Sequence, residues 1–81
     1  MKRFVWEPAA RADLRRLDRE TALRILHTLT RYGETGEGDV KRLAEREGLY
    51  RLRVGKWRIF FDLDSPGLVR LHGIDNRGQA Y

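Results

Sequence analysis

The chain has 81 residues, no cysteine, and seventeen Lys and Arg against twelve Asp and Glu, which gives a net charge of +5. This length allows one domain, residues 1–81, with one small core, and the absence of cysteine excludes a disulfide framework and a cysteine-based zinc site. The apolar runs are too short for a membrane span or a signal peptide, so we expect a cytoplasmic protein with no membrane partner.

The first part of the sequence predicts a short strand followed by two helices. Residues 2–8 read as the opening strand, and Pro8 suits the first turn of a helix. Asp18 is placed to cap the second helix, and Gly33 should end it. Almost no spacer separates the helices, so we expect them to form an antiparallel hairpin. Each helix has one apolar stripe: Ala10, Leu14 and Leu17 in the first, and Ala22, Ile25, Leu26, Leu29 and Tyr32 in the second.

The second part of the sequence is rich in strand-forming residues. A loop that carries Val40 and Leu43 comes first. Residues 50–54 and 57–63 then read as two strands, because the Gly-Lys pair at 55–56 suits a two-residue hairpin turn. This turn sets the register, and the expected pairs are Val54–Trp57, Arg53–Arg58, Leu52–Ile59, Arg51–Phe60 and Tyr50–Phe61.

Alternation along these two strands separates an apolar face from a basic face. The basic face consists of Arg51, Arg53, Arg58 and Phe60. Arg53 and Arg58 lie directly opposite each other, and like charges in this position destabilise a sheet. Neither strand supplies a carboxylate before Asp62, so the pattern favours a ligand-binding role for these arginines. The apolar face, which should pack on the helices, comprises Tyr50, Leu52, Val54, Trp57, Ile59 and Phe61.

The last predicted strand, residues 68–74, follows a turn at Asp-Ser-Pro-Gly. A three-residue loop in this turn places Arg70, His72 and Ile74 on the side of the basic face. The same register puts His72 opposite Phe60. The segment after the strand adds Arg77 and Tyr81 at the edge of this surface.

Basic side chains interleaved with an aromatic ring are typical of single-stranded nucleic-acid binding, because phosphates pair with Arg and a base stacks on the ring. Arginine supplies most of the positive charge, and its planar fork matches phosphate oxygens. The sequence shows no carboxylate pair on this face, no histidine motif, no P-loop and no dinucleotide fingerprint. We therefore expect neither a metal nor a cofactor.

Metal-free RNA cleavage is one use of such a face, because the ribose 2′-OH is itself the nucleophile. The protein has to orient the hydroxyl, neutralise the phosphorane with arginine, and move two protons. Proton transfer would fall to Tyr81, to His72, or to a Lys or carboxylate with a shifted pKa. Binding without catalysis would produce the same pattern.

The stretch DVKRLAEREGLYRLRVGKWRIFF, residues 39–61, resembles the core of RelE-type toxins, and the closing IDNRGQAY, residues 74–81, resembles their C-terminal pattern. The chain is similar to the RelE/ParE toxin superfamily over essentially its whole length. This resemblance implies an α+β fold, in which an N-terminal strand and a two-helix antiparallel hairpin are packed on a mainly antiparallel four-stranded sheet.

The RelE-like branch of this superfamily also implies a function. Its members are toxins of type II toxin–antitoxin systems, and they are endoribonucleases, or mRNA interferases. They enter the ribosomal A site and cut mRNA there by metal-free 2′-OH attack, which inhibits translation until a cognate antitoxin neutralises them. The resemblance thus implies two partners, the antitoxin and mRNA on the ribosome with its ribosomal RNA, and no small-molecule cofactor.

The branch further implies roles for single residues. Arg58 matches the arginine that stabilises the transition state, Arg77 matches one that assists the leaving group or phosphate, and Tyr81 matches a tyrosine that acts as base or stacks on a base. The matches to the residues that grip the RNA backbone are Arg51 and Arg53. Phe60 and His72 join the RNA-binding set from their expected place beside them.

Two positions depart from the family pattern: Asn76 stands where many members have His, and Lys56 replaces a common Asp in the turn. An alternative from another class is a ParE-like toxin that poisons DNA gyrase by protein contact without RNA cleavage. A third is a nuclease-inactive module that only binds its antitoxin. The basic residues and the tail residues favour RNA cleavage over the ParE-like alternative, whereas the sequence is equally compatible with the third.

Overall fold

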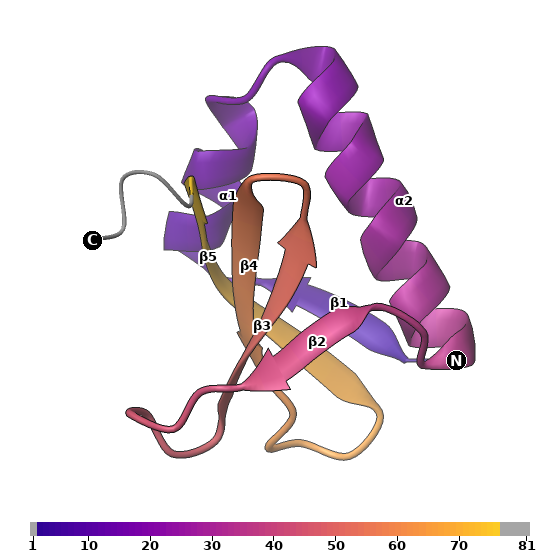
Figure 1. The fold of residues 1–81 in the computed structure, drawn as a ribbon, viewed down its shortest axis with the longest axis vertical. Coiled ribbons are helices and arrows are strands. Elements are labelled where there is room, and N and C mark those ends of the chain that lie inside the picture. The colour runs from indigo at the N-terminus through magenta and orange to yellow at the C-terminus, as the bar shows by residue number, and fades with distance from the viewer. Residues whose placement is uncertain (1, 77–81) are drawn as a thin grey trace.

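A computed structural model describes residues 2–76 of the chain. Two helices lie on one side of a twisted sheet (Figure 1). No helix in the described part is both long and apolar enough to cross a membrane. In chain order the elements are β1 (Arg3–Trp6), α1 (Pro8–Arg15), α2 (Arg19–Thr35), β2 (Asp39–Arg42), β3 (Leu49–Val54), β4 (Trp57–Asp62) and β5 (Leu68–Asn76).

The strands of the described residues form one mixed sheet in the order β1-β5-β4-β3-β2. β1 pairs with β5 in parallel, and all other neighbours are antiparallel. The predicted α+β class is confirmed, but the prediction of four strands and a loop at Val40 is wrong, because residues 39–42 form β2. Val40 pairs with Leu52 and packs on the core. An edge strand this short, with one inward apolar side chain, carries too little alternation to be recognised.

Both helices begin where the sequence predicted. Pro8 is the first residue of α1, where its missing N–H leaves no hydrogen bond unmade. Asp18 caps α2, because its carboxylate accepts the backbone N–H of Thr21 at 3.1 Å, and this hydrogen bonding lowers the pKa of Asp18. Ala10 of α1 and Ile25 of α2 are fully buried. Most of the predicted apolar stripes therefore face the core, and Leu14, Leu17, Leu29 and Tyr32 also lie in or against it. Ala22 and Leu26 of the second stripe are only partly buried.

Helix α2 continues past Gly33, where it was predicted to end. It ends after Thr35 at Gly36, whose φ of 79° is a left-handed conformation that glycine adopts without strain. Gly33 is buried inside the helix against the ring of Phe4, and a Cβ placed there would lie 2.8 Å from that ring. The glycine at position 33 thus allows close packing of α2 on β1.

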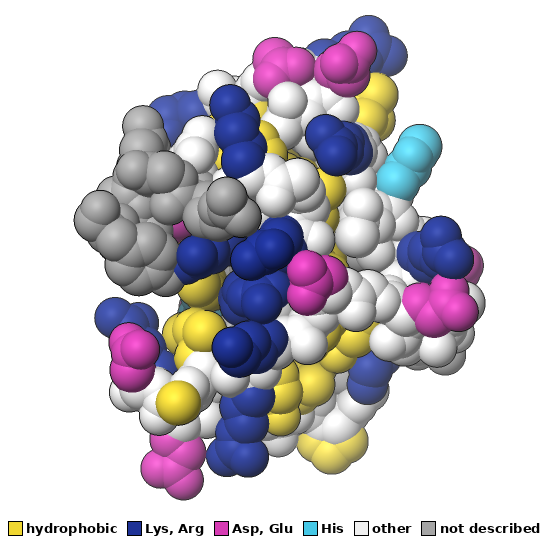
Figure 2. Space-filling model, in the orientation of Figure 1, with side chains coloured by type: hydrophobic (Ala, Val, Ile, Leu, Met, Phe, Trp, Pro, Cys, Tyr) yellow, Lys and Arg dark blue, Asp and Glu magenta, His cyan; other side chains and the backbone are white. Residues whose placement is uncertain are grey.

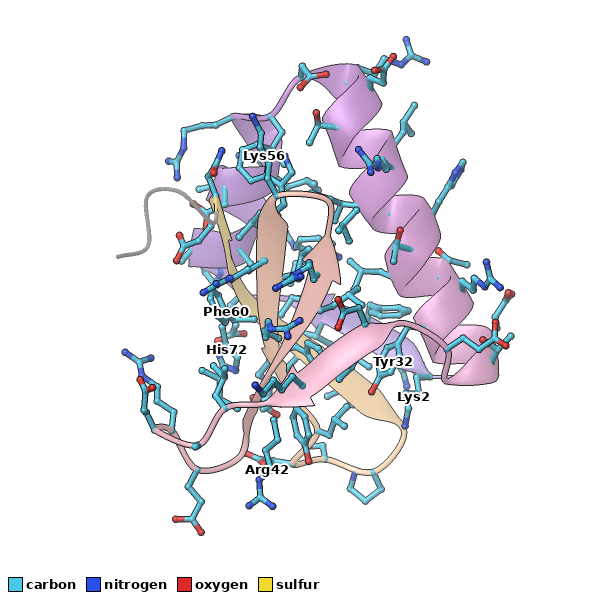
Figure 3. The ribbon with its side chains drawn as sticks, viewed as in Figure 1. Lys2, Tyr32, Arg42, Lys56, Phe60 and His72 are labelled. Carbon is cyan, nitrogen blue, oxygen red and sulfur yellow. The ribbon has the colours of Figure 1, made fainter. Side chains whose placement is uncertain are left out.

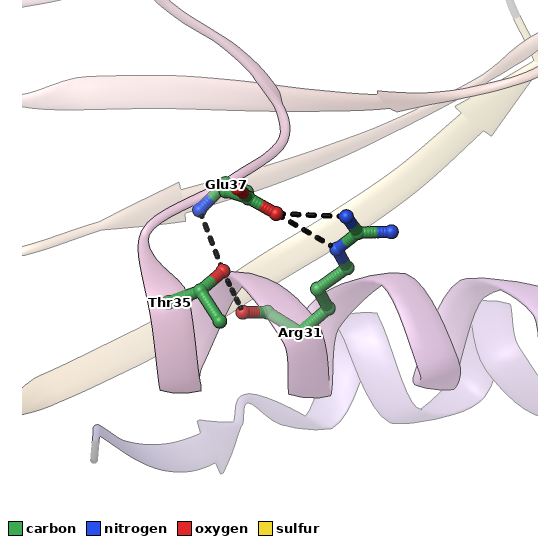
Figure 4. A network of polar contacts seen from close by, with 3 residues as sticks. All are labelled: Arg31, Thr35 and Glu37. Carbon is green, nitrogen blue, oxygen red and sulfur yellow. Dashed lines mark hydrogen bonds and ion pairs between the residues drawn. The ribbon is translucent and has the colours of Figure 1, made fainter.

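A short polar network holds the chain where it leaves α2 (Figure 4). Thr35 Oγ1 donates a hydrogen bond to the carbonyl of Arg31 at 2.9 Å and accepts one from the backbone N–H of Glu37 at 3.0 Å. The Arg31 guanidinium donates to Glu37 Oε1 at 2.8 and 3.1 Å. These bonds tie the end of the helix to the segment that leads into β2.

The β3–β4 hairpin has every predicted pair, and its turn contains Gly55 with a φ of 60°. Its apolar face packs on the helices, as the alternation predicted. Phe61 is fully buried near the centre of this core. Its ring centroid lies 5.6 Å from that of Tyr50 and 5.5 Å from that of Tyr32 on α2, so the hairpin and the helix share one aromatic cluster.

The pairing of β4 with β5 differs from the prediction by a β-bulge. Phe60 pairs with Gly73 and Phe61 with Leu71, so His72 is the extra residue and does not stand opposite Phe60. One extra residue reverses the side on which the following residues lie. Ile74 consequently faces the core with 6% exposure, and its predicted place beside the basic face is wrong.

Candidate nucleic-acid interface

The basic face lies on the side of the sheet away from the helices. Arg53 pairs with Arg58 and Arg51 pairs with Phe60, so the four residues form a compact block on β3 and β4. All four are partly exposed. Lys41 of β2 continues the row beside Arg51. Figure 2 shows the Lys and Arg side chains gathered down the middle of this side of the molecule.

A surface groove of about 290 Å³ lies between the basic face and the chain that follows β2. Several cations face a single carboxylate in it, and a concave site of one charge sign attracts an oppositely charged ligand. Lys41 and Arg42 of β2 line the groove but are not among the predicted site residues. The signal for them in the sequence is a Lys-Arg pair just before the basic strands. The charged lining residues are Lys41, Arg42, Glu45, Arg51, Arg53 and Arg58.

Asp39 at the start of β2 supplies a carboxylate that the sequence analysis did not expect. It pairs in register with Arg53, and its Oδ2 lies 3.9 Å from Arg53 Nε. Its Oδ1 lies 3.4 Å from Arg51 Nη1, which also donates to the Asp39 carbonyl at 3.2 Å. On the other side, Arg58 pairs in register with Asp75 of β5. Acidic residues on neighbouring strands thus offset the opposed arginines. The hairpin itself supplies no carboxylate before Asp62, as the sequence shows, but β2 and β5 bring Asp39 and Asp75 beside it.

The two arginines beside Asp39 differ in their freedom to bind a ligand. The Arg51 side chain is 12% exposed and is held by Asp39, whereas the Arg53 side chain is 38% exposed. Arg53 Nε is buried and makes no hydrogen bond within residues 2–76. A guanidinium has five N–H donors, so Arg53 keeps donors available for an anion that enters the groove.

Replacement of Asp39 by asparagine is expected to raise the affinity for a single-stranded RNA oligonucleotide. The change removes a charge that competes with phosphate for Arg51 and Arg53. An exposed ion pair contributes at most about 1 kcal/mol, so the gain should be about two- to fivefold. Fluorescence anisotropy at fixed salt measures it. Glu37→Gln is the matched control, because it breaks the ion pair with Arg31 next to α2 and should leave the affinity unchanged. Unchanged binding by the Asp39 variant would count against this competition.

His72 lies beside the basic face and binds a carboxylate from β4. Its Nε2 is 2.5 Å from Asp62 Oδ2, and Asp62 Oδ1 accepts the backbone N–H of Asp64 at 3.1 Å. Burial acts to raise the pKa of Asp62, but the hydrogen bonds from His72 and Asp64, with the charges of His72 and Arg70, lower it overall. Sequence reasoning missed Asp62 as a partner, because nothing local relates residues ten positions apart across a bulged strand pair.

The bulge that positions His72 is fixed from the helical layer. Asp13 of α1 accepts the backbone N–H of Ile74 through Oδ2 at 2.9 Å. β5 extends to Asn76, beyond the predicted strand end at residue 74. The predicted site residues Arg77 and Tyr81 lie outside the described residues. Within residues 2–76 no group of three or more His, Asp or Glu side chains is arranged to hold a metal ion.

Comparisons with known proteins agree with this architecture. Residues 4–81 match the family described as ParE toxin of type II toxin-antitoxin system, parDE. The RelB–RelE antitoxin–toxin complex of Methanococcus jannaschii contains a chain with the same fold, at 17% identity and a TM-score of 0.77, with 95% of this chain and 94% of that chain covered. No curated protein sequence is similar enough to this chain to count as a relative.

Two further solved structures share the fold. In the intact Escherichia coli RelBE toxin–antitoxin complex the match has 13% identity and a TM-score of 0.79, and it covers 94% of this chain and 96% of that one. In the archaeal RelE–RelB complex of Pyrococcus horikoshii OT3 the values are 20% and 0.75, with 98% of both chains covered. At these identities the likeness establishes the fold.

Proposed function

The chain belongs to the ParE toxin family of type II toxin–antitoxin systems, and we propose that it acts as a ribosome-dependent endoribonuclease of the RelE kind. In this proposal it enters the ribosomal A site, cuts mRNA and inhibits translation. The observation that carries the proposal is the groove lined by Arg51, Arg53 and Arg58, with Phe60 beside it. Arginines that hold phosphates and a ring that stacks a base are the two contacts that single-stranded RNA requires.

The proposed reaction is a metal-free transesterification. The ribose 2′-oxygen attacks the adjacent phosphorus, the P–O5′ bond breaks, and a 2′,3′-cyclic phosphate forms. Arg51 and Arg53 hold the RNA backbone, while Arg58 neutralises the charge that develops on the phosphorane. Arg77 and Tyr81 are proposed to assist at the phosphate and to act as the base.

A cognate antitoxin is the second proposed partner. The three solved structures described above are RelB–RelE complexes of a toxin with its antitoxin. The chain carries a net charge of +5, and several of its Lys and Arg side chains line the groove. An acidic antitoxin segment would be drawn to this surface by charge, which speeds association, and would block access of RNA to the basic face.

The ParE-like activity is the second candidate, and the family match to the toxin of parDE favours it. In that case the chain would poison DNA gyrase by protein contact and would not cut RNA. The two candidate functions differ in whether they require the basic face. RNA cleavage requires its arginines, whereas gyrase contact does not depend on them.

Primer extension on an mRNA in translating ribosomes tests the proposal, with toxin separated from its antitoxin. Cuts within A-site codons that require ribosomes are the expected result. A gyrase supercoiling assay with the same preparation is the companion measurement. Intact mRNA together with inhibited supercoiling would replace the endoribonuclease proposal with the ParE-like one. A result with neither mRNA cleavage nor inhibition of supercoiling would indicate a module that only binds its antitoxin.

A further inference from the structure

Asp62 and His72 form an ion pair that the proposed roles of the arginines leave unused. His72 Nε2 lies 2.5 Å from Asp62 Oδ2. The Asp62 side chain is 13% exposed, and its second oxygen accepts the backbone N–H of Asp64 at 3.1 Å. These hydrogen bonds favour the ionised carboxylate. A buried, ionised carboxylate that holds one ring nitrogen is the arrangement that orients a histidine for proton transfer.

The imidazole lies next to the surface proposed to hold RNA. His72 precedes Gly73, which pairs with Phe60, and Phe60 in turn pairs with Arg51. Neighbouring strands are about 4.8 Å apart, so β5 lies about 10 Å across the sheet from the backbone of Arg51. Figure 3 shows His72 and Phe60 close together on the open side of the sheet. The His72 side chain is 39% exposed, so its imidazole is accessible from the side of the sheet that carries Phe60 and the arginines.

We propose that His72, oriented by Asp62, is the general acid that protonates the leaving 5′-oxygen when the RNA backbone is cut. This inference rests on the proposed endoribonuclease function and adds a residue to it. The sequence alone predicts His72 as an RNA-binding residue and as one of several candidates for proton transfer. The contact with Asp62 supplies the orienting partner that a proton donor requires.

The proton balance of the step assigns a role to each ring nitrogen. Asp62 engages Nε2, so Nδ1 is the nitrogen that can donate to RNA. As the 2′-oxygen bonds to phosphorus, the P–O5′ bond breaks and its electron pair passes to the 5′-oxygen. That oxygen takes the proton from Nδ1 of the imidazolium, and the ring becomes neutral and later regains a proton from water. The proton of the 2′-OH goes to a separate base, for which Tyr81 is proposed.

The neighbouring cations are poorly suited to the same task. Arg51, Arg53 and Arg58 have guanidinium groups that stay protonated at any working pH, so they stabilise charge but release a proton reluctantly. The second histidine of the chain, His27, is exposed on α2, in the helical layer. His72 also lies within strand β5, at the bulge. Asp13 of α1 fixes the strand there, because it accepts the backbone N–H of Ile74 two residues later.

His72→Gln tests the proposal with two substrates on programmed ribosomes. Glutamine keeps an N–H donor for Asp62 but transfers no proton. Synthetic mRNA carries either oxygen or sulfur at the 5′-bridging position of the cut. We expect the single-turnover rate on the oxygen substrate to fall about 100-fold, because that is the usual contribution of a general acid. On the sulfur substrate the variant should match the wild type, because a thiolate leaves without protonation.

Two further variants complete the design. His27→Gln makes the same exchange outside the site and should behave as wild type on both substrates. Asp62→Asn leaves a neutral partner on the imidazole and should show the same selective loss on the oxygen substrate, which keeps the test decisive if His72→Gln does not fold. Thermal unfolding of each variant reports whether the fold is kept.

The outcomes separate this inference from the function on which it rests. Equal losses on both substrates would show that His72 only binds RNA, and unchanged rates on both would show no role; either result overturns the acid assignment while RNA cleavage stands. If the wild type itself leaves ribosome-bound mRNA intact, the endoribonuclease proposal fails and the acid role fails with it.

Discussion

Replacement of Arg58 by alanine is expected to lower the rate of A-site cleavage about 1,000-fold while the fold is kept. Arg58 lines the groove and is flanked in register by Arg53 and Asp75, so it lies at the centre of the interface. Its removal takes away positive charge where the proposed phosphorane develops but leaves Arg51 and Arg53 to hold the RNA. The loss should therefore appear in the single-turnover rate on ribosomes more than in the affinity for RNA.

Two companion variants make this result specific. Arg19→Ala removes the same side chain from an exposed position at the start of α2 and should leave the rate unchanged. Arg58→Lys keeps the charge but loses the planar fork, so an intermediate rate is expected. Cleavage by Arg58→Ala at close to the wild-type rate would remove Arg58 from the catalytic machinery. Reduced folding of that variant, checked by circular dichroism, would assign the residue a structural role instead.

Replacement of Phe61 by alanine is expected to lower the free energy of unfolding by about 3–5 kcal/mol. Phe61 is fully buried and packs on the rings of Tyr32 and Tyr50, so its truncation opens a cavity between α2 and the hairpin. Small domains have a total stability of about 5–15 kcal/mol, so this is a large part of what holds the chain folded. Denaturant unfolding followed by tryptophan fluorescence measures the change.

Phe60→Ala is the matched control, because the same side chain is removed one residue away on the opposite face. Phe60 is only partly buried on the basic face. Its loss should cost far less stability, but it should weaken binding of a single-stranded RNA oligonucleotide by about 1–3 kcal/mol if a base stacks on the ring. Similar stability losses in the two variants would contradict the assignment of the two faces. Unchanged RNA binding by Phe60→Ala would remove the stacking role.

Local patterns sufficed for much of the fold. The hairpin register follows from a two-residue turn at 55–56, and strict alternation on both sides assigns each side chain to a face, because a slip by one residue would expose the whole apolar set. The cap at Asp18 is equally local. Gly33 was misread because a glycine needed for close packing against Phe4 and a glycine that ends a helix look the same in sequence.

Three cations of the candidate site could also be predicted, since Arg51, Arg53 and Arg58 lie on one face of a hairpin and alternation alone places them together. Their acidic partners could not. Asp39 contacts Arg51 and Arg53 from β2, the strand that was not predicted. Asp62 contacts His72 across the β-bulge. That bulge is held by Asp13 of α1, which binds the N–H of Ile74 sixty-one positions later. Turns and alternation act between neighbours in the chain and can be read from it, whereas the charge balance of the groove and the orientation of the imidazole arise from contacts that exist once distant segments have packed.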